Sequence, residues 1–180
     1  MTVKKHHSGY LPHDPSCLPI SGRAADLVSY LQLEPHPEGG YFRRMFQSPH
    51  RVHPSDDRGT RSALTAIYFL LPAGFCSRWH RVASDEVWHH FEGSPLQLLT
   101  FSPDGADVFI TTLGPLSDTS APMHGVPAGW WQAARPLGSY CFMGCIVGPG
   151  FEYADFTLLS ECPEARQLAP DGIPGFTDLL

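Results

Sequence analysis

The sequence predicts an all-β domain, an antiparallel sandwich or barrel preceded by one short helix. From Gly39 onward, short runs rich in aromatic and β-branched residues recur at a spacing of about 8–12 residues, which is typical of all-β domains. Turn clusters separate most of these runs, as at Ser102-Pro103-Asp104-Gly105. The 180 residues suffice for one such domain with spare chain at its ends.

The two ends of the chain differ from its middle. Residues 1–20 hold three prolines, both lysines and little apolar periodicity, so we expect a flexible tail there. A short helix is expected over Arg23–Leu33, with Ser21 as its N-cap. We assign the folded domain to residues 21–165 and expect a loose C-terminal tail over residues 166–180.

Several of the expected strands are apolar on both faces, notably Leu64–Leu71. One face would fill a barrel, and the other needs cover from the helix or from a partner subunit. A homodimer is therefore expected. The eight expected strands cover Tyr41–Gln47, Arg61–Leu71, Trp79–Val82, Asp85–Phe91, Leu96–Phe101, Asp107–Leu113, Val126–Ala134 and Ser139–Val147, with Phe156–Leu159 as a further candidate.

Composition and charge argue against several functions. The net charge of −6 disfavours a nucleic-acid partner, which selects for a basic face. Apolar runs such as Ala63–Leu71 are about half the length of a membrane-spanning helix, so no membrane partner is expected. The five irregularly spaced cysteines favour reduced thiols and a cytoplasmic protein. Both lysines lie in the N-terminal tail, which argues against a lysine Schiff base in the folded domain.

Two degenerate motifs lie within this all-β pattern. The stretch Gly74–Gly93 has the spacing of a metal-binding β-barrel motif, G-x5-H-x-H-x3-E-x6-G, with His80 and Glu86 retained and Val82 in place of the second histidine. Residues 127–132 match a second motif, P-x-G-x2-H, with glutamine in place of its histidine. The two motifs, in this order, resemble those of the cupin superfamily.

A closer resemblance covers most of the chain, from about Leu33 to Phe156. The stretches PHPEGGYF, TAIYFLLP, WHRVASDEVWH, VPAGWWQA and GPGFEYADF are similar to the cupin-5 subfamily. This resemblance implies a cupin barrel, the double-stranded β-helix or jelly-roll fold, after a short N-terminal helix. The subfamily has no assigned reaction, and in shape it resembles dTDP-sugar epimerases and plant storage proteins.

The resemblance also implies a metal site, which this chain retains only in part. The ordinary cupin ligand set would shrink to His80, Glu86 and Gln132, and a neutral amide is a weak ligand for zinc, iron or nickel. His90, on the same strand face as Glu86, is a candidate replacement. No cofactor is the first expectation, and a divalent metal in an enzyme such as a dioxygenase is the alternative.

Without a metal, His80 and Glu86 form a candidate acid/base pair. A buried carboxylate beside an imidazole would fix the tautomer of the ring and raise its basicity. This resembles the sugar-nucleotide epimerases of the superfamily, in which histidine removes a proton next to a carbonyl and tyrosine returns one. Tyr68 and Tyr140 are the candidate tyrosines. The cation that an enolate needs would come from Arg43, Arg61 or Arg78.

Trp88 and Trp130 would add flat apolar surface to this pocket, beside His90 and Gln132 as substrate contacts. Glu38 is interpreted as structural, in an ion pair with an arginine. We therefore predict a barrel that binds a small molecule, an isomerase or epimerase acting on a polar or carbohydrate-like substrate. The second alternative is a non-catalytic barrel that senses or stores a ligand.

Overall fold

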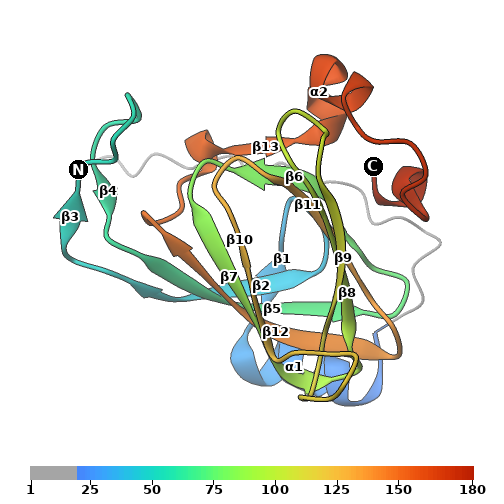
Figure 1. Ribbon diagram of the computed structural model, residues 1–180. Coiled ribbons are helices and arrows are strands. Elements are labelled where there is room, and N and C mark those ends of the chain that lie inside the picture. Colours follow the sequence, from blue (N-terminus) through green and yellow to red (C-terminus); the bar gives the residue numbers. More distant parts are fainter. Residues whose placement is uncertain (1–19) are drawn as a thin grey trace.

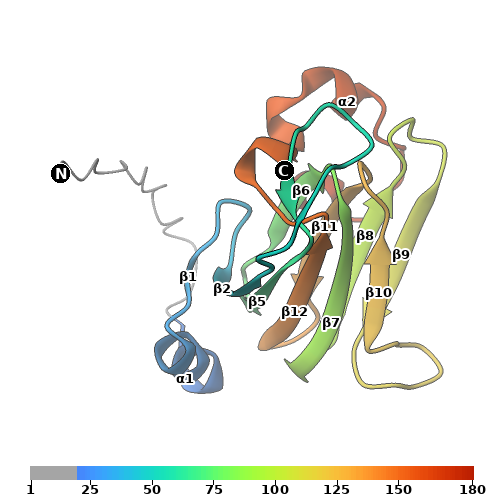
Figure 2. The ribbon, with the colours of Figure 1, turned by 90° about the vertical axis from the view of Figure 1, so that its left-hand side faces the viewer.

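The computed structural model describes residues 20–180, so the prediction of a flexible tail over residues 1–20 falls almost entirely outside the described residues. Two antiparallel sheets face each other and form a barrel (Figure 1). Helix α1 lies outside the barrel at one end of it, and the view turned by 90° shows this helix clear of most of the strands (Figure 2). The predicted all-β fold with a short N-terminal helix is confirmed.

The larger sheet has six strands and the smaller has five. In spatial order the larger contains β1 (Glu34–Pro35), β2 (Tyr41–Gln47), β5 (Thr65–Pro72), β12 (Tyr140–Gly148), β7 (Asp85–Gly93) and β10 (Met123–Val126). The smaller contains β13 (Phe156–Leu158), β6 (Ser77–Val82), β11 (Trp131–Pro136), β8 (Leu96–Phe101) and β9 (Val108–Leu113). A separate ribbon pairs β3 (Arg51–Val52) with β4 (Arg61–Ser62).

The described helices are short. They are α1 (Gly22–Leu31) and α2 (Pro163–Gln167), with 3-10 turns η1 (Tyr153–Asp155), η2 (Leu159–Glu161) and η3 (Phe176–Leu179). Within residues 20–180, neither the length nor the apolar character of any helix is sufficient to cross a membrane.

Two of the expected strands are divided in the structure. The run Val126–Ala134 becomes β10 in the larger sheet and β11 in the smaller, so the chain changes sheets within it. The turn between them contains Pro127, which has no N–H to donate, and Gly129, whose φ is +79°. The run Arg61–Leu71 becomes β4 and β5, because the backbone of residues 63–64 pairs with the segment before β3 instead.

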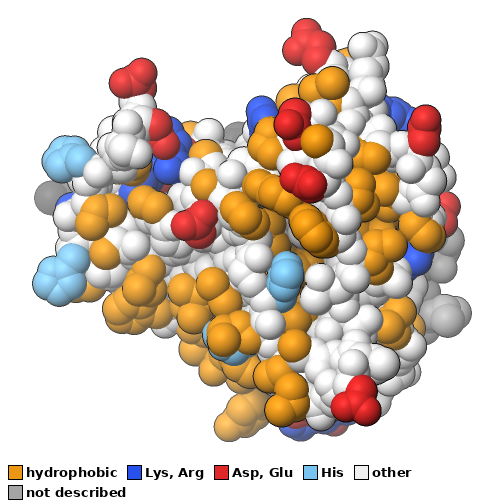
Figure 3. Space-filling view, in the orientation of Figure 1, with side chains coloured by type: hydrophobic (Ala, Val, Ile, Leu, Met, Phe, Trp, Pro, Cys, Tyr) orange, Lys and Arg blue, Asp and Glu red, His pale blue; other side chains and the backbone are white. Residues whose placement is uncertain are grey.

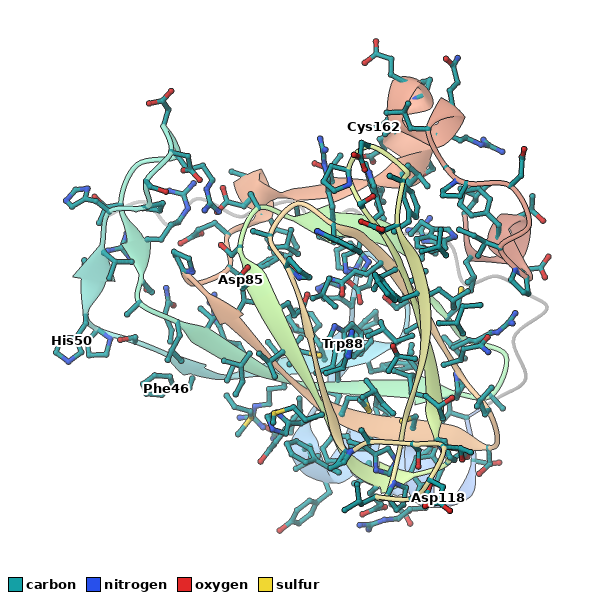
Figure 4. All side chains as sticks on the ribbon, in the orientation of Figure 1. Phe46, His50, Asp85, Trp88, Asp118 and Cys162 are labelled. Atoms are coloured by element: carbon teal, nitrogen blue, oxygen red, sulfur yellow. The ribbon has the colours of Figure 1, made fainter. Side chains whose placement is uncertain are left out.

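A hydrophobic core lies between the two sheets. Trp88 is 1% exposed and lies inside the barrel, as Figure 4 shows. Phe69 packs edge-on against Trp88, with the ring centroids 5.7 Å apart. Phe69 and Cys145 belong to this core and also line the cavity described below, so the core forms part of the cavity wall.

Helix α1 covers part of the outer face of the larger sheet. Leu27 of the helix packs with Leu70 of β5 and Phe142 of β12. The helix ends at Leu31 rather than at the expected Leu33, because Gln32 adopts a left-handed φ of 54° as its C-cap.

The rest of this outer face is open in the described chain. Phe46, Phe91, Met123 and Ile146 are between 38% and 53% exposed. Figure 3 shows hydrophobic side chains gathered at the lower left, over the strands of the larger sheet. An exposed apolar patch of this kind is typical of an interaction surface. The homodimer expected from the sequence stays a prediction, and we expect it on this face.

The C-terminal segment is packed, which corrects the expected loose tail over residues 166–180. Ile173 and Leu179 are buried on the outer face of the smaller sheet, together with Trp79 and Trp131. The indole N–H of Trp79 donates to the carbonyl of Phe176 at 3.2 Å. Strand alternation turns both tryptophans away from the barrel interior, so their apolar surface needs this cover. The folded domain therefore extends to the last residue.

Replacing Leu179 with alanine tests this extension. Leu179 is 2% exposed, so Leu179→Ala should lower the free energy of unfolding by about 2–4 kcal/mol in urea denaturation. Leu168→Ala is the matched control, since Leu168 is 51% exposed and its loss should cost less than about 0.5 kcal/mol. Equal, small losses in the two variants would show that the segment does not pack.

Candidate functional site

A cavity of about 260 Å³ opens inside the barrel beside the core. Its walls combine aromatic and aliphatic side chains with a few ionisable groups, which is the usual composition of a small-molecule site. Its volume is just below the roughly 300–1,000 Å³ of drug-sized pockets, so it suits a small metabolite. The lining residues are Glu34, His36, Glu38, Phe42, Arg44, Thr65, Ile67, Phe69, His80, Val82, Glu86, Cys145, Val147, Phe151 and Tyr153.

The loop between β1 and β2 carries Glu38 into this cavity. Gly39 permits the path, since a Cβ there would lie 2.0 Å from the carbonyl oxygen of Cys76. Arg78 holds the loop from the other side. Its backbone N–H donates to the Glu38 carbonyl at 2.8 Å, and its guanidinium donates to the carbonyl of Pro37. Glu38 is only 6% exposed in this position.

Two histidines face the carboxyl group of Glu38. Its Oε2 lies 3.4 Å from His36 Nδ1 and 3.4 Å from His80 Nε2. Its Oε1 accepts a hydrogen bond from the Ser77 hydroxyl at 2.8 Å. The carboxyl, both imidazoles and the hydroxyl are shielded from bulk water, so their interactions are stronger than at the surface.

The remaining hydrogen bonds of the two imidazoles indicate where the protons lie. His80 Nδ1 is 2.7 Å from the carbonyl oxygen of Arg78, so Nδ1 carries the proton and Nε2 of the neutral ring has a lone pair. His36 Nδ1 accepts from the backbone N–H of Glu38 at 3.3 Å, so it also presents a lone pair. A protonated Glu38 therefore gives the lone pair of His80 Nε2 a donor, while the one lone pair of His36 Nδ1 already accepts from the backbone. Burial favours the same state, because it raises the pKa of Glu38 and lowers the pKa of both imidazoles.

A second buried carboxyl belongs to Glu86 on β7. Gln132 on β11 donates from Nε2 to Glu86 Oε2 at 2.6 Å, and its Oε1 accepts from the indole N–H of Trp88 at 3.0 Å. Trp88 thereby fixes which end of the amide faces Glu86. Burial raises the pKa of Glu86 to about 7, although the bond from Gln132, and a positive charge on His80 whenever that ring is protonated, favour the ionised form. This carboxyl exchanges its proton near neutral pH.

The structure places His80 and Glu86 in one cavity, but it does not make Glu86 the group that orients His80. The imidazole is held instead by the carbonyl of Arg78 and faces Glu38. The interpretation of Glu38 as the partner of an arginine in a structural ion pair is also wrong, because Arg78 does not contact its carboxyl group. Its carboxyl contacts Ser77 and the two histidines, and the arginine bonds only to backbone carbonyls.

Three predicted site residues lie on the outer face of the larger sheet. Tyr68 packs against Phe142 in the cluster under α1, and the Tyr140 hydroxyl donates to Glu92 at 2.8 Å. Arg43 donates to the carbonyl of Leu31 at the end of the helix. Because side chains alternate along a strand, these residues point away from the cavity and cannot reach a ligand in it.

Four further candidates stay at the edge of the site or outside it. His90 faces the carbonyl of Ser94 at 3.2 Å, because a bulge in the pairing of β7 with β12 follows it. Trp130 stacks on Phe109 with the ring centroids 5.9 Å apart, outside the cavity lining. Arg61 and Arg78 make structural hydrogen bonds, to the Asp155 carboxylate and to loop carbonyls respectively.

Sequence reasoning missed His36, Glu38, Arg44 and Tyr153, which all line the cavity. Alternation along β2 was sufficient to find Arg44, because Phe42, two residues earlier, also faces inward. His36 and Glu38 lie in a loop and Tyr153 in a 3-10 turn, where no strand period predicts direction. For Tyr153, the aromatic residues around it in the sequence were the one available indication of a place in the site.

The expected metal ligands do not fit a metal ion here. Gln132 Oε1, the atom of the amide that can bind a cation, accepts from Trp88, while the NH₂ group faces Glu86. His90, the proposed replacement, is not part of the cavity lining. Among residues 20–180, no three His, Cys, Asp or Glu side chains are arranged to hold a metal ion. The chemistry proposed below uses protein side chains alone.

The barrel and its cavity together define a protein of the cupin class. Residues 25–159 match the family described as "Cupin superfamily (DUF985)", and the chain belongs to this family. The resemblance stated from the sequence motifs is therefore confirmed.

Similar proteins are found in distant organisms. The chain is 25% identical over 173 residues to an uncharacterized protein of Saccharomyces cerevisiae, covering 88% of this chain and 83% of the yeast protein. A hypothetical protein from Leishmania major superposes with a TM-score of 0.70 and 29% identity, covering 83% of this chain and all of that one. A protein from Shewanella oneidensis superposes with a TM-score of 0.69 and 30% identity, covering 84% of this chain and 100% of the Shewanella chain. Oxalate decarboxylase from Bacillus subtilis shares the fold alone, with a TM-score of 0.52 and 13% identity over 70% of this chain and 29% of that one.

The stability of the protein should depend on pH through Glu86. Because burial raises its pKa from 4.5 to about 7, the protonated carboxyl stabilises the fold, and this contribution is lost as the pH rises through that interval. Glu86→Gln stays neutral, so its free energy of unfolding relative to wild type should rise by up to about 3 kcal/mol between about pH 4 and pH 8. Urea denaturation at several pH values measures this difference.

Glu164→Gln, an exposed change on α2, is the control and should follow the wild-type pH dependence. If the Glu86→Gln curve also runs parallel to wild type at all pH values, the pKa of Glu86 is not raised in the fold.

Proposed function

We propose that the protein is an isomerase or epimerase that moves a proton within a small polar substrate, using the two buried carboxyl groups and His80. The observation that carries this proposal is the meeting of Glu86 and the His36–Glu38–His80 cluster in one small cavity. Carboxyl groups and imidazoles placed together in a water-poor cavity are the usual equipment of general acid/base catalysis.

Glu86 is the better candidate for the base. Its pKa near 7 leaves a useful fraction ionised at neutral pH, and Gln132 holds one of its oxygens in place. His80 is less suited to direct proton abstraction than the sequence suggested. One of its nitrogens is committed to the Arg78 carbonyl and the other faces Glu38.

Glu38 and His80 then form the acid side of the reaction. The Glu86 carboxylate takes a proton from a carbon next to a carbonyl, and the electron pair of that C–H bond moves into the carbonyl as an enolate or enol. The protonated Glu38 donates its proton to the carbonyl oxygen, and the Glu38 carboxylate that remains lies beside His80. In a 2-hydroxy carbonyl substrate, Glu86 gives the proton to the former carbonyl carbon, while the hydroxyl on the deprotonated carbon returns a proton to Glu38 and becomes the new carbonyl, so the product is an isomer. If the enol turns over in the cavity first, Glu86 returns the proton to the other face of the same carbon and the enol O–H returns its proton to Glu38, so the product is an epimer. Neither outcome requires a co-reactant.

The main alternative is a barrel that binds its ligand without reaction. The apolar and aromatic walls of the cavity serve binding as well as catalysis. What favours the enzyme is the burial of the acidic groups, because a binding site gains nothing from carboxyls held at the cost of desolvation.

Deuterium exchange tests the proposal without knowledge of the substrate. The full-length protein is incubated in D₂O with small 2-hydroxy ketones, 2-hydroxy aldehydes and 2-oxo acids, and proton NMR follows the C–H signals next to each carbonyl. We expect protein-dependent loss of one such signal. Glu86→Gln should slow this exchange by about 10²–10⁴-fold.

The exposed change Glu164→Gln is the matched control and should exchange at the wild-type rate. A probe that binds in the cavity but shows no exchange in any variant would identify the protein as the non-catalytic barrel instead.

A further inference from the structure

The mouth of the cavity carries a cation without an ionic partner. Arg44 lines the cavity from β2, while its neighbour Arg43 points to the opposite face and bonds to the end of α1. The Arg44 side chain is exposed, and its guanidinium makes no hydrogen bond or ion pair with any residue between 20 and 180, although its backbone pairs with β5. Among the described residues, Arg166 on α2 is the only other arginine whose side chain has no ion pair, hydrogen bond or ring contact. A guanidinium at a cavity mouth with nothing bound to it is suited to carboxylate or phosphate.

Tyr153 stands beside this cation. Its ring stacks on His36 with centroids 6.3 Å apart and meets Phe151 edge-on at 5.2 Å, so the ring is held although it is 55% exposed. Its hydroxyl makes no hydrogen bond within the described chain, and this O–H is a second available donor. The two groups are close in space. Burial raises the pKa of Tyr153, and the positive charge of Arg44 acts against that rise.

The interior of the cavity is unsuited to an anionic group. Glu38 and Glu86 are buried there, and an anion placed beside them would face one or two carboxylates whenever these ionise. Glu34 also borders the cavity, opposite Phe42 in the β1–β2 pair, but it is exposed and its repulsion is screened by water and salt. The cavity thus has Arg44 and the exposed Glu34 at its mouth and two buried acids inside.

We propose that the ligand is a small organic acid or phosphate ester whose anionic group is held at the mouth by Arg44 and Tyr153. Its uncharged end, a carbonyl or hydroxyl-bearing carbon, reaches inward toward Glu86 and Glu38. The identity of the reacting end rests on the proposed function, whereas the anionic end rests on the mouth alone. The cavity of about 260 Å³ limits the inward part to a few carbon atoms.

Matched probe pairs test this ligand class. Pyruvate is compared with hydroxyacetone, and dihydroxyacetone phosphate with dihydroxyacetone, by isothermal titration and by ¹⁵N NMR shifts of cavity residues. Within each pair the acid should bind about 10–100-fold more tightly than the neutral compound. The first pair tests for binding of a carboxylate and the second for binding of a phosphate. The pair with the larger preference for its acid therefore identifies which anionic group the ligand carries.

Variants of the mouth then locate the effect. Arg44→Gln should remove the preference for the acid, and Tyr153→Phe should reduce it. Glu34→Gln should strengthen acid binding, since it removes the one acidic group at the mouth. Arg166→Gln, the matched control, should leave both affinities unchanged.

Equal affinities within both pairs, the absence of binding by either acid, or acid binding that survives Arg44→Gln would each overturn the inference. Its failure is separable from that of the proposed function. If acid binding depends on Arg44 but no probe shows deuterium exchange, the anion site is supported and the proposed enzymatic function is rejected. If the neutral probes show deuterium exchange and the acids are not preferred, the proposed enzymatic function is supported and the anion site is rejected.

Discussion

The burial of the Glu38 carboxyl against two imidazoles is the interaction on which the site depends. An isolated carboxylate at this depth would cost several kcal/mol, and removing the charge avoids most of that cost. The Ser77 hydroxyl as donor and His80 Nε2 as acceptor satisfy the neutral group. The loop between β1 and β2 is thereby fixed inside the barrel, where it closes one side of the cavity and gives His80 its partner.

This arrangement explains how the barrel functions without the two motif histidines. Val82, at the first changed position, is an apolar part of the cavity wall. Gln132, at the second, links Trp88 to Glu86 and so converts a ligand position into a support for the base. The retained His80 contacts a carboxyl of the protein, supplied by the loop. The two substitutions thus leave an apolar wall and a hydrogen-bonded amide where the motif would have placed two histidines.

Strand periodicity explains both what the sequence could predict and where prediction failed. His80, Val82 and Glu86 were placed correctly on inward faces, because alternation with a period of two holds along β6 and β7.

Arg43 was instead chosen as an arginine of the barrel, and alternation was not applied to β2, where it places Arg44 inward. Tyr68 was likewise chosen by residue type, and it faces outward beneath helix α1. His36 and Glu38 were beyond reach for a different reason. Their position follows from a long-range contact with His80 that no local pattern encodes.

The inner part of the site and its mouth are built by different means, and this has a consequence for their rigidity. Glu86 and His80 sit on paired strands, whereas Tyr153 sits on a short 3-10 turn. That turn is held by Asp155, which accepts two hydrogen bonds from Arg61, both at 2.8 Å. Arg61 thus acts on the site through Tyr153 and not through a ligand. The Arg61 and Asp155 side chains are only 13% and 2% exposed, so salt screens this ion pair weakly. The mouth should therefore keep its shape at ionic strengths that weaken the binding of an anion to Arg44.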